Sequence, residues 1–341
     1  MRALLDKLLD GVDLTGEEAR ELMSAIMDGA AAPAQIAAAL AALRVKGETV
    51  DEIAGFARAM RERVDAVDVS GDKVIDTCGT GGDARGTFNI STATALVAAG
   101  MGITVAKHGN RAVSSSCGSA DVLEALGVAV DLPPARVAEL VDELGIGFMF
   151  APRHHPAMRH AMPVRRELGA RTVFNVLGPL TNPAGVRRQL LGVYRPALTV
   201  TLARVLGRLG SERAFVVCGY DGVDEVSATG PTHVAELRDG EVREYSFAPE
   251  LVGLERCSLD DLAGGDPQMN ARRVREVLDG ASGPCRDAVL LNAGFCAVLA
   301  GLTDDPAEGV ELAAAAVDGG RARAVLDALV ERTRAMAGGA S

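Results

Sequence analysis

A glycine-rich turn is the first part of this sequence that is suited to binding an anion. Residues 79–83 read GTGGD and directly follow a short β-rich run, residues 73–77. Three glycines in four positions let backbone N–H groups approach an anion closely, where a Cβ would obstruct it. The turn has neither the lysine of a Walker loop nor the GxGxxG spacing of a dinucleotide fold. On its own it is therefore equally typical of an ordinary strand-to-helix turn.

A second stretch suited to anions begins a helix a few residues further on. Residues 89–92 read NIST. The free N–H groups at a helix N-terminus bind anions readily, and Asn, Ser and Thr side chains add further hydrogen bonds. The alternative is that Ser91 or Thr92 is an ordinary N-cap. Two such turns so close together favour one ligand with two phosphate groups over two unrelated turns.

A third polar stretch, residues 107–116, follows the next β-rich run, residues 103–106. It reads KHGNRAVSSS, which supplies many hydrogen-bond donors and almost no apolar anchor, and Ser119 lies at the start of the helix behind it. Ligands of an open α/β sheet bind outside the carboxyl ends of its strands. Because a loop this polar is unusual before a core helix, we expect it to bind a ligand.

An acidic pair, Asp224 and Glu225, follows the β-rich run at residues 214–218. Adjacent carboxylates repel each other unless a cation or solvent lies between them. Proteins typically hold Mg²⁺ with one or two carboxylates, substrate phosphates and water. The pair alone is also typical of an exposed acidic turn, but together with the three polar stretches it indicates a magnesium site.

Arginine is concentrated in one segment of an otherwise acidic chain. Residues 149–195 contain eight arginines, no lysine and a single acid, Glu167. The planar guanidinium group suits carboxylates and phosphates, so this segment indicates a small anionic substrate. Any single arginine in it is as easily part of a solvated helix face. His108, His154 and His155 are candidates for proton transfer, although shaping a pocket is the simpler role for them.

The hydrophobic pattern predicts two kinds of architecture along the chain. Residues 1–70 show helical periodicity and two capping boxes, at residues 15–18 and 49–52. From residue 71 on, short β-rich runs alternate with alanine-rich helices, and Asp239-Gly240 is typical of a β-hairpin turn. We therefore predict an α/β protein: a small all-helical N-terminal domain, then a large α/β domain with a mostly parallel central sheet and C-terminal helices.

The pattern also places the elements and the domain boundary. Strands are expected at residues 73–77, 103–107, 128–130, 148–150, 190–194 and 213–218, and C-terminal helices near residues 268–280, 284–300, 306–318 and 320–336. We expect a helical domain at residues 1–70, an α/β domain at residues 71–341, and a hinge segment at residues 160–190 that returns to the helical domain. Because the helical domain is short for an independent core, its apolar faces are expected to pack on the rest of the chain or on a second subunit, and a dimer surface is the favoured alternative.

Composition excludes several classes of protein. The chain has 341 residues, 48% hydrophobic and 24% charged, which is ordinary for a folded protein and not for a disordered one. Its net charge of −11 argues against general binding to nucleic acids or anionic membranes. We expect no membrane span and no secretory signal. The six scattered cysteines, which include no CxxC pair, are typical of a cytoplasmic protein.

Taken together, these stretches resemble the anthranilate phosphoribosyltransferase family. The stretches that carry the resemblance are GTGGD (79–83), NIST (89–92), KHGNRAVSS (107–115) with Ser119, HHPAMRHAMPVRRELGARTVFNVLGPLTNP (154–183) and DE (224–225). The resemblance implies a cytoplasmic, homodimeric, Mg²⁺-dependent enzyme of tryptophan biosynthesis. Such an enzyme transfers the phosphoribosyl group of 5-phosphoribosyl 1-pyrophosphate to the amine of anthranilate and releases pyrophosphate.

The resemblance also implies a role for each matching residue. Phosphoribosyl pyrophosphate would be bound by Gly79, Gly82, Asp83, Thr87, Asn89, Ile90, Ser91, Thr92, Lys107, His108, Gly109, Asn110, Arg111, Ala112, Val113, Ser114, Ser115 and Ser119. Two Mg²⁺ ions would be held by Ser91, Asp224 and Glu225, and anthranilate would be contacted by Gly79, Asn110 and Arg165. Lys107, Asp224 and Glu225 would be the catalytic residues, and residues 71–341 the catalytic domain.

The chemistry expected of such a site depends on charge. Departure of pyrophosphate from the ribose C1 builds negative charge on the leaving group, which Mg²⁺, Lys107 and backbone N–H groups would stabilise. The anthranilate amine is already neutral and nucleophilic, so neither a strong general base nor a covalent intermediate is required. Two alternatives stay open: a pyrimidine nucleoside phosphorylase of the same architecture, and a non-catalytic nucleic-acid-binding relative.

Overall fold

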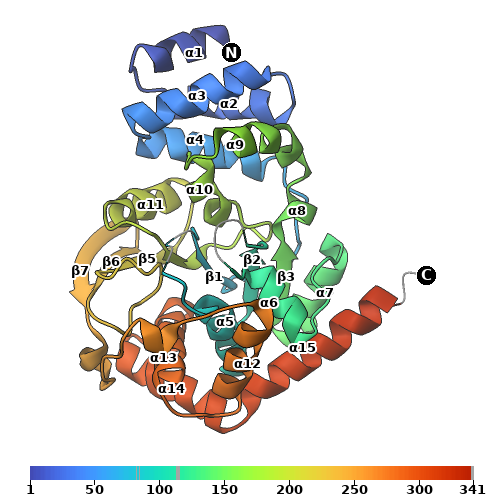
Figure 1. Ribbon diagram of the computed structural model, residues 1–341, viewed down its shortest axis with the longest axis vertical. Coiled ribbons are helices and arrows are strands. Elements are labelled where there is room, and N and C mark those ends of the chain that lie inside the picture. Colours follow the sequence, from blue (N-terminus) through green and yellow to red (C-terminus); the bar gives the residue numbers. More distant parts are fainter. Residues whose placement is uncertain (82, 84, 113–115, 339–341) are drawn as a thin grey trace.

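The computed structural model describes residues 1–81, 83, 85–112 and 116–338 (Figure 1). A layer of helices lies at one end of the molecule, above a sheet that is covered by further helices. The N-terminal helices of this layer are α1 (Arg2–Leu9), α2 (Gly16–Met27), α3 (Pro33–Lys46) and α4 (Val50–Arg61). The prediction of a helical N-terminal part followed by a larger α/β part is confirmed.

Both predicted capping boxes are present and begin α2 and α4. The Thr15 hydroxyl accepts from the Glu18 N–H at 3.2 Å, and the Glu18 carboxylate accepts from the Thr15 N–H at 3.0 Å. Thr49 and Glu52 repeat this arrangement at the start of α4. Each box satisfies donors that would otherwise lack a partner at the start of the helix. The two helices then bury their apolar faces against each other.

The central sheet has seven strands in the order β3-β2-β1-β4-β5-β6-β7. Their bounds are β1 (Ile75–Gly79), β2 (Val105–Gly109), β3 (Ile146–Phe150), β4 (Arg188–Gly192), β5 (Arg213–Gly219), β6 (Thr232–Arg238) and β7 (Glu241–Phe247). The first five strands are parallel, and β6 and β7 are antiparallel. The chain runs outward from β1 in one direction through β2 and β3 and in the other through β4. The carboxyl ends of β1, β2 and β4 are therefore where such a sheet binds ligands.

The remaining helices and short 3₁₀ turns either cover the sheet or join the layer of N-terminal helices. They are α5 (Ile90–Gly100), α6 (Ser119–Leu126), α7 (Pro134–Leu144), α8 (Ala151–His154), η1 (Pro156–His160), α9 (Met162–Leu168), α10 (Phe174–Leu177), η2 (Gly178–Thr181), α11 (Ala197–Arg208), η3 (Pro249–Val252), η4 (Asp260–Leu262), α12 (Pro267–Leu278), α13 (Pro284–Ala300), α14 (Pro306–Asp318) and α15 (Arg321–Gly338). α5 is buried along almost its whole length and packs on α13 and α15, so its N-terminus is fixed at the sheet edge. α9 and α10 return to the N-terminal helices, where they contact α3 and α4 (Figure 1).

The predicted hairpin is confirmed, and one predicted strand is wrong. Asp239 and Gly240 have φ of 54° and 79°, the left-handed backbone of a two-residue hairpin turn between β6 and β7. Residues 128–130, in contrast, form no strand. Val128 and Val130 are buried as expected, but the Ala129 N–H donates to the Thr333 hydroxyl of α15 at 3.1 Å. The hydrogen bond of the Ala129 N–H is therefore made with a helix side chain and not with a neighbouring strand.

The described part of the chain contains no helix with the length and apolar character that crossing a bilayer requires.

Candidate active site

The glycine-rich turn after β1 folds against the acidic pair. The Thr80 N–H donates to the Gly192 carbonyl at 2.8 Å, and the Gly81 N–H donates to Asp224 Oδ2 at 3.0 Å. A Cβ at Gly79 would lie 2.4 Å from Asp224 Oδ2, and one at Gly192 would lie 1.5 Å from the Asp224 carbonyl oxygen. The two glycines at these strand ends therefore make room for Asp224, a packing reason that the sequence did not reveal.

The start of α5 is held by the second acid of the pair. The Ser91 N–H donates to Glu225 Oε1 at 3.1 Å, and the Thr77 hydroxyl donates to the Ser91 carbonyl at 3.1 Å. Ser91 is half-buried, as are Thr87 and Asn89 before the helix. The helix N-terminus that the sequence marked as an anion site is thus partly occupied by Glu225 in this structure.

Lys107 joins the strand ends to the start of the helix. It lies on β2 with 3% of its surface exposed. Its ammonium group donates to the Thr77 carbonyl and lies 3.4 Å from Ser91 Oγ. One short chain of contacts therefore connects Lys107, Ser91 and Glu225, although the three residues come from distant parts of the sequence.

The site carries more acidic than basic side chains. Burial, and then the charge of Asp83, raise the pKa of Asp224 to about 7. Burial and the charge of Asp224 raise the pKa of Glu225 well above its ordinary range, and burial raises the pKa of Asp83. Like charges at close range in a poorly solvated site disfavour ionisation unless a cation is added. Lys107 supplies only one positive charge among them.

This donor set fits a magnesium ion. Asp224, Glu225 and the Ser91 hydroxyl offer hard oxygen ligands. Asp83 Oδ2 and the Thr80 hydroxyl are buried there and have no hydrogen-bond partner among the described residues. Among the described residues, no group of three or more His, Cys, Asp or Glu side chains forms a complete metal cage. Mg²⁺ usually binds through one or two carboxylates and completes its coordination with substrate phosphates and water.

The basic loop after β2 presents Asn110 and Arg111 at the surface. The Ser119 hydroxyl donates to the Asn110 carbonyl at 3.3 Å, and a Cβ at Gly109 would lie 2.1 Å from Ser119 Oγ. Arg111 lies over the Phe150 ring, 5.4 Å from its centre, and forms an ion pair with Glu124. A phosphate group bound by Arg111 would have to compete with that acid. Gly82, Val113, Ser114 and Ser115 lie outside the described residues.

Arg165 lies on α9, on the helical side of the molecule. It is half-buried and lies 5.0 Å from the centre of the Phe174 ring, and its Nη1 donates to Met162 Sδ at 3.7 Å. Burial lowers its pKa. None of these described contacts is with a carboxylate, and none reaches Gly79 or Asn110. The structure therefore does not bring the three residues expected at anthranilate into direct contact.

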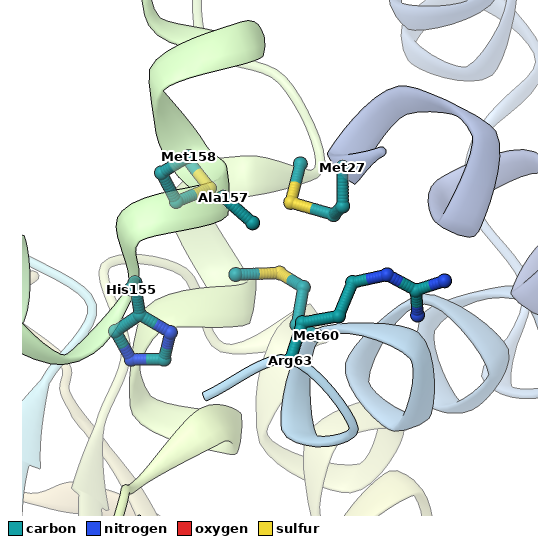
Figure 2. A pocket seen from close by; sticks show the side chains of 6 residues that line it. All are labelled: Met27, Met60, Arg63, His155, Ala157 and Met158. Carbon is teal, nitrogen blue, oxygen red and sulfur yellow. The ribbon is translucent and has the colours of Figure 1, made fainter. Parts of the chain in front are cut away.

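Three histidines lie where the helical layer meets the sheet. His108 Nε2 and His155 Nε2 are 3.2 Å apart, and His154 Nδ1 is 3.0 Å from the Asp65 carbonyl oxygen. Figure 2 shows Met27, Met60 and Met158 side chains gathered beside the His155 ring. His154 and His155 thus pack at a junction between helices and contribute to its shape, and His108 reaches the same junction from β2.

Acid should destabilise this junction. Burial, followed by the charge of His154, lowers the pKa of His155 to about 4, and burial lowers the pKa of His108 well below its ordinary range. Because the unfolded chain then binds more protons, the stability is complete above pH 6.5 and is lost as pH falls toward 4. We expect His155 alone to account for about 3 kcal/mol of that loss. Urea unfolding between pH 4 and 7 measures it; a His155→Gln variant with an equally steep pH dependence would contradict the assignment.

Sequence reasoning missed a buried carboxylate, Asp76, which has none of its surface exposed. Its Oδ1 accepts from the His108 N–H at 3.2 Å and its Oδ2 from Asn182 Nδ2 at 2.8 Å. Asn182 Nδ2 also donates to the Ala106 carbonyl at 2.9 Å. This pair ties β1 and β2, near their first residues, to the segment after η2. The only sequence sign of it was an acid in the middle of a buried apolar run.

Comparison with known proteins agrees with this geometry. Residues 71–323 match the family model described as "Glycosyl transferase family, a/b domain", and residues 2–64 match "Glycosyl transferase family, helical bundle domain". Anthranilate phosphoribosyltransferase from Moorella thermoacetica is 56% identical over 330 residues, which cover 97% of each chain. The crystal structure of the enzyme of that name from Thermus thermophilus has 48% identity and a TM-score of 0.93 over 97% of this chain and 99% of its own.

A more distant relative has been solved with ligands bound. Anthranilate phosphoribosyltransferase from Saccharomyces cerevisiae in complex with PRPP and Mg is 30% identical, with a TM-score of 0.90 over 98% of this chain and 97% of its own. Fold and site together define a glycosyl transferase with a helical bundle and an α/β domain. Within that class, the chain belongs to the anthranilate phosphoribosyltransferase family. The resemblance drawn from the sequence motifs is confirmed.

Proposed function

We propose that this chain transfers the phosphoribosyl group of phosphoribosyl pyrophosphate to the amine of anthranilate, the second step of tryptophan biosynthesis from chorismate. The observation that carries the proposal is the meeting of Lys107, Ser91, Asp224 and Glu225 at the carboxyl edge of the sheet. A buried lysine beside two half-buried acids suits a ligand made of a divalent cation and phosphate oxygens. Membership of the family supports the choice of substrates.

Within this proposal, the strand-end turns and the start of α5 bind the doubly phosphorylated sugar. Its proposed contacts among the described residues are Gly79, Asp83, Thr87, Asn89, Ile90, Ser91, Thr92, Lys107, His108, Gly109, Asn110, Arg111, Ala112 and Ser119. Ser91, Asp224 and Glu225 would hold two Mg²⁺ ions, and the magnesium in the yeast structure supports the metal itself. When bound, magnesium neutralises charge on the pyrophosphate.

The reaction needs positioning and electrostatics more than proton transfer. The bond between ribose C1 and the pyrophosphate oxygen breaks, a bond from C1 to the amine nitrogen forms, and the nitrogen then releases one proton to solvent. Lys107 and the N–H groups of the glycine-rich turn stabilise the negative charge that grows on the leaving oxygen. A general base is unnecessary because anthranilate enters with a neutral, nucleophilic amine. Orientation of the amine against C1 supplies much of the remaining acceleration.

The test of the proposed function is a fluorescence assay. Anthranilate fluorescence should fall when purified protein, phosphoribosyl pyrophosphate and Mg²⁺ are mixed, and it should stay constant when Mg²⁺ is chelated. Parallel reactions with thymidine and phosphate test the nucleoside phosphorylase alternative. Turnover of thymidine without turnover of anthranilate would overturn the proposal, and so would salt-resistant nucleic-acid binding by a protein that consumes neither substrate.

Replacing Arg165 should weaken anthranilate binding selectively. Its half-buried guanidinium group contacts Phe174 and Met162 and makes no described ion pair, so it is available for a carboxylate. Because a hydrogen bond to a charged group contributes about 1.5–3 kcal/mol, Arg165→Ala should raise the anthranilate KM by about ten- to a hundredfold. The KM for phosphoribosyl pyrophosphate should change less than about twofold. The matched control is Arg166→Ala on the exposed face of the same helix, and equal effects of the two variants would contradict this role.

We propose a helical domain at residues 1–70 and a catalytic domain at residues 71–341, with residues 160–190 as the hinge whose closing brings Arg165 toward Gly79 and Asn110. We also propose a cytoplasmic homodimer formed through the helical domain, where Val45 of α3 is 89% exposed. Sedimentation of the native chain and of a Val45→Asp variant tests the dimer, since a monomeric native chain would exclude it.

A further inference from the structure

A segment far along the chain lies beside the turn that begins α5. The Phe88 N–H donates to the Leu262 carbonyl at 2.9 Å, the Gly264 N–H donates to the Gly86 carbonyl at 2.7 Å, and Thr87 pairs with Ala263 in an antiparallel bridge. We call residues 262–270 the strap. No motif in the sequence drew attention to it, yet it supports the backbone on which the residues expected to bind phosphate stand.

The strap approaches this turn too closely for most side chains. A Cβ at Gly264 would lie 2.8 Å from the Phe88 nitrogen, the Phe88 Cα and the Thr87 carbonyl oxygen. All three are backbone atoms, so rotation of a side chain would not relieve the clash. The contact between the strap and residues 87–88 is therefore a fixed part of the fold.

Asn270, at the end of the strap, controls a side chain at the site. It is 1% exposed and lies in the first turns of α12. Its Oδ1 accepts from the Gly265 N–H at 2.8 Å, and its Nδ2 donates to Asn89 Oδ1 at 2.8 Å. The backbone N–H of Gly265 requires an acceptor, which fixes the orientation of the Asn270 amide. That orientation leaves Asn270 only a donor to offer Asn89.

The orientation of Asn89 follows from this. Because its oxygen is bonded to Asn270, its nitrogen faces the other way and donates to the Cys117 carbonyl at 3.2 Å. An amide nitrogen has two hydrogens, so the second remains for a ligand oxygen. The Ser116 hydroxyl also donates to the Gly265 carbonyl at 2.9 Å. The strap thus fixes two sides of the site: the start of α5 and the chain leading into α6.

We propose that Asn270 is a positioning residue for phosphoribosyl pyrophosphate, which makes Asn89 present an N–H donor, and not an oxygen, to the bound ligand. The inference rests on the proposed function, since it concerns the same substrate site. Asn270 bonds to Asn89 and to the Gly265 backbone, and it also contacts the Cys117 thiol. None of these groups takes part in the reaction, so the effect of Asn270 is on substrate binding.

The decisive variant is Asn270→Asp. The carboxylate keeps the volume and still accepts from the Gly265 N–H, but it has no hydrogen for Asn89. Asn89 must then turn its nitrogen toward residue 270 and its oxygen toward the Cys117 carbonyl and the ligand. We expect the KM for phosphoribosyl pyrophosphate to rise about tenfold or more, with kcat at saturation within about threefold and the anthranilate KM within about twofold. A Kd for phosphoribosyl pyrophosphate with MgCl₂ from calorimetry should rise in parallel.

The matched control is Thr333→Val in the second half of α15. It removes a buried hydroxyl that accepts a hydrogen bond from the Ala129 N–H. It should lower the melting temperature without changing either KM. If Asn270→Asp loses thermal stability in the same way and keeps the native KM and Kd, the residue is only structural and the inference fails. If the native chain binds phosphoribosyl pyrophosphate but consumes no anthranilate, the proposed function fails, while the calorimetric comparison still decides the role of Asn270.

Discussion

Converting both acids after β5 to amides, as Asp224→Asn with Glu225→Gln, should lower kcat/KM for phosphoribosyl pyrophosphate by about a thousandfold or more. The amide oxygens still accept from the Gly81 and Ser91 N–H groups, so the backbone of the site is retained. What is lost is the negative charge that a magnesium ion needs. Initial rates across a range of MgCl₂ concentrations measure the effect, and added Mg²⁺ should not restore the native rate.

The same variant should be at least as stable as the native chain when no metal is added. Both acids are half-buried, and the pKa of Asp224, about 7 in the folded chain, lies above its ordinary 3.8. A group whose pKa is raised by folding stabilises at low pH and loses that contribution as pH rises toward the folded value. Near pH 8 the ionised acids therefore cost stability, and amides remove that cost.

Loss of activity with a maintained or higher melting temperature would distinguish a metal site from a structural one. The exposed pair on β7, changed as Glu241→Gln with Glu244→Gln, removes the same number of charges from the same sheet and serves as the control. Its activity and Mg²⁺ dependence should stay native. Native activity and native Mg²⁺ dependence in the double variant would show that Asp224 and Glu225 have no role in the reaction.

Most of the fold was predictable from the sequence because most strands and helices follow from local patterns of apolar and capping residues. β1 to β5 coincide with buried apolar runs, and the capping boxes at Thr15 and Thr49 mark true helix starts. The strand expected at residues 128–130 failed because strand formation depends on a neighbour. The sequence indicated only that the apolar side chains of residues 128–130 are buried. The hydrogen-bond acceptor for the Ala129 N–H is Thr333 on α15, which is 204 residues away in the chain.

The site was predictable only as a meeting of loops. Parallel strands end at one edge of a sheet, so polar stretches after β1, β2 and β5 were expected to meet there. Which atoms bond was not predictable. Nothing local indicates that Glu225 accepts from the Ser91 N–H, or that Asn182 reaches Asp76 across 106 residues. Asn270 lies in an unremarkable helix start, and only the three-dimensional contact with Asn89 gives it a role.

Replacing Lys107 with methionine should lower kcat by about a hundred- to a thousandfold. The side chain keeps its length, but the ammonium group that donates to the Thr77 carbonyl and lies near Ser91 is gone. In the native chain the positive charge of Lys107 lowers the pKa of Asp224 and of Glu225. The variant removes this charge, so the pKa of both acids should rise. Because the charge of Lys107 favours the ionised form of both acids, the variant should also melt at a lower temperature near pH 8.

Two further variants separate the effect of Lys107 on stability from its effect on catalysis. Lys46→Met provides the first comparison. The Lys46 side chain, in the helical layer, is also largely buried, and its ammonium group forms ion pairs with Glu52 at 2.9 Å and with Asp13 at 2.6 Å. It should lower the melting temperature and leave kcat within about threefold. Lys107→Met with Glu225→Gln provides the second, since it removes one basic and one acidic group from the same site. That double variant should regain thermal stability but not kcat, a non-additive result that assigns the ammonium group to the reaction. If kcat returns together with the melting temperature, Lys107 serves only to neutralise the two acids.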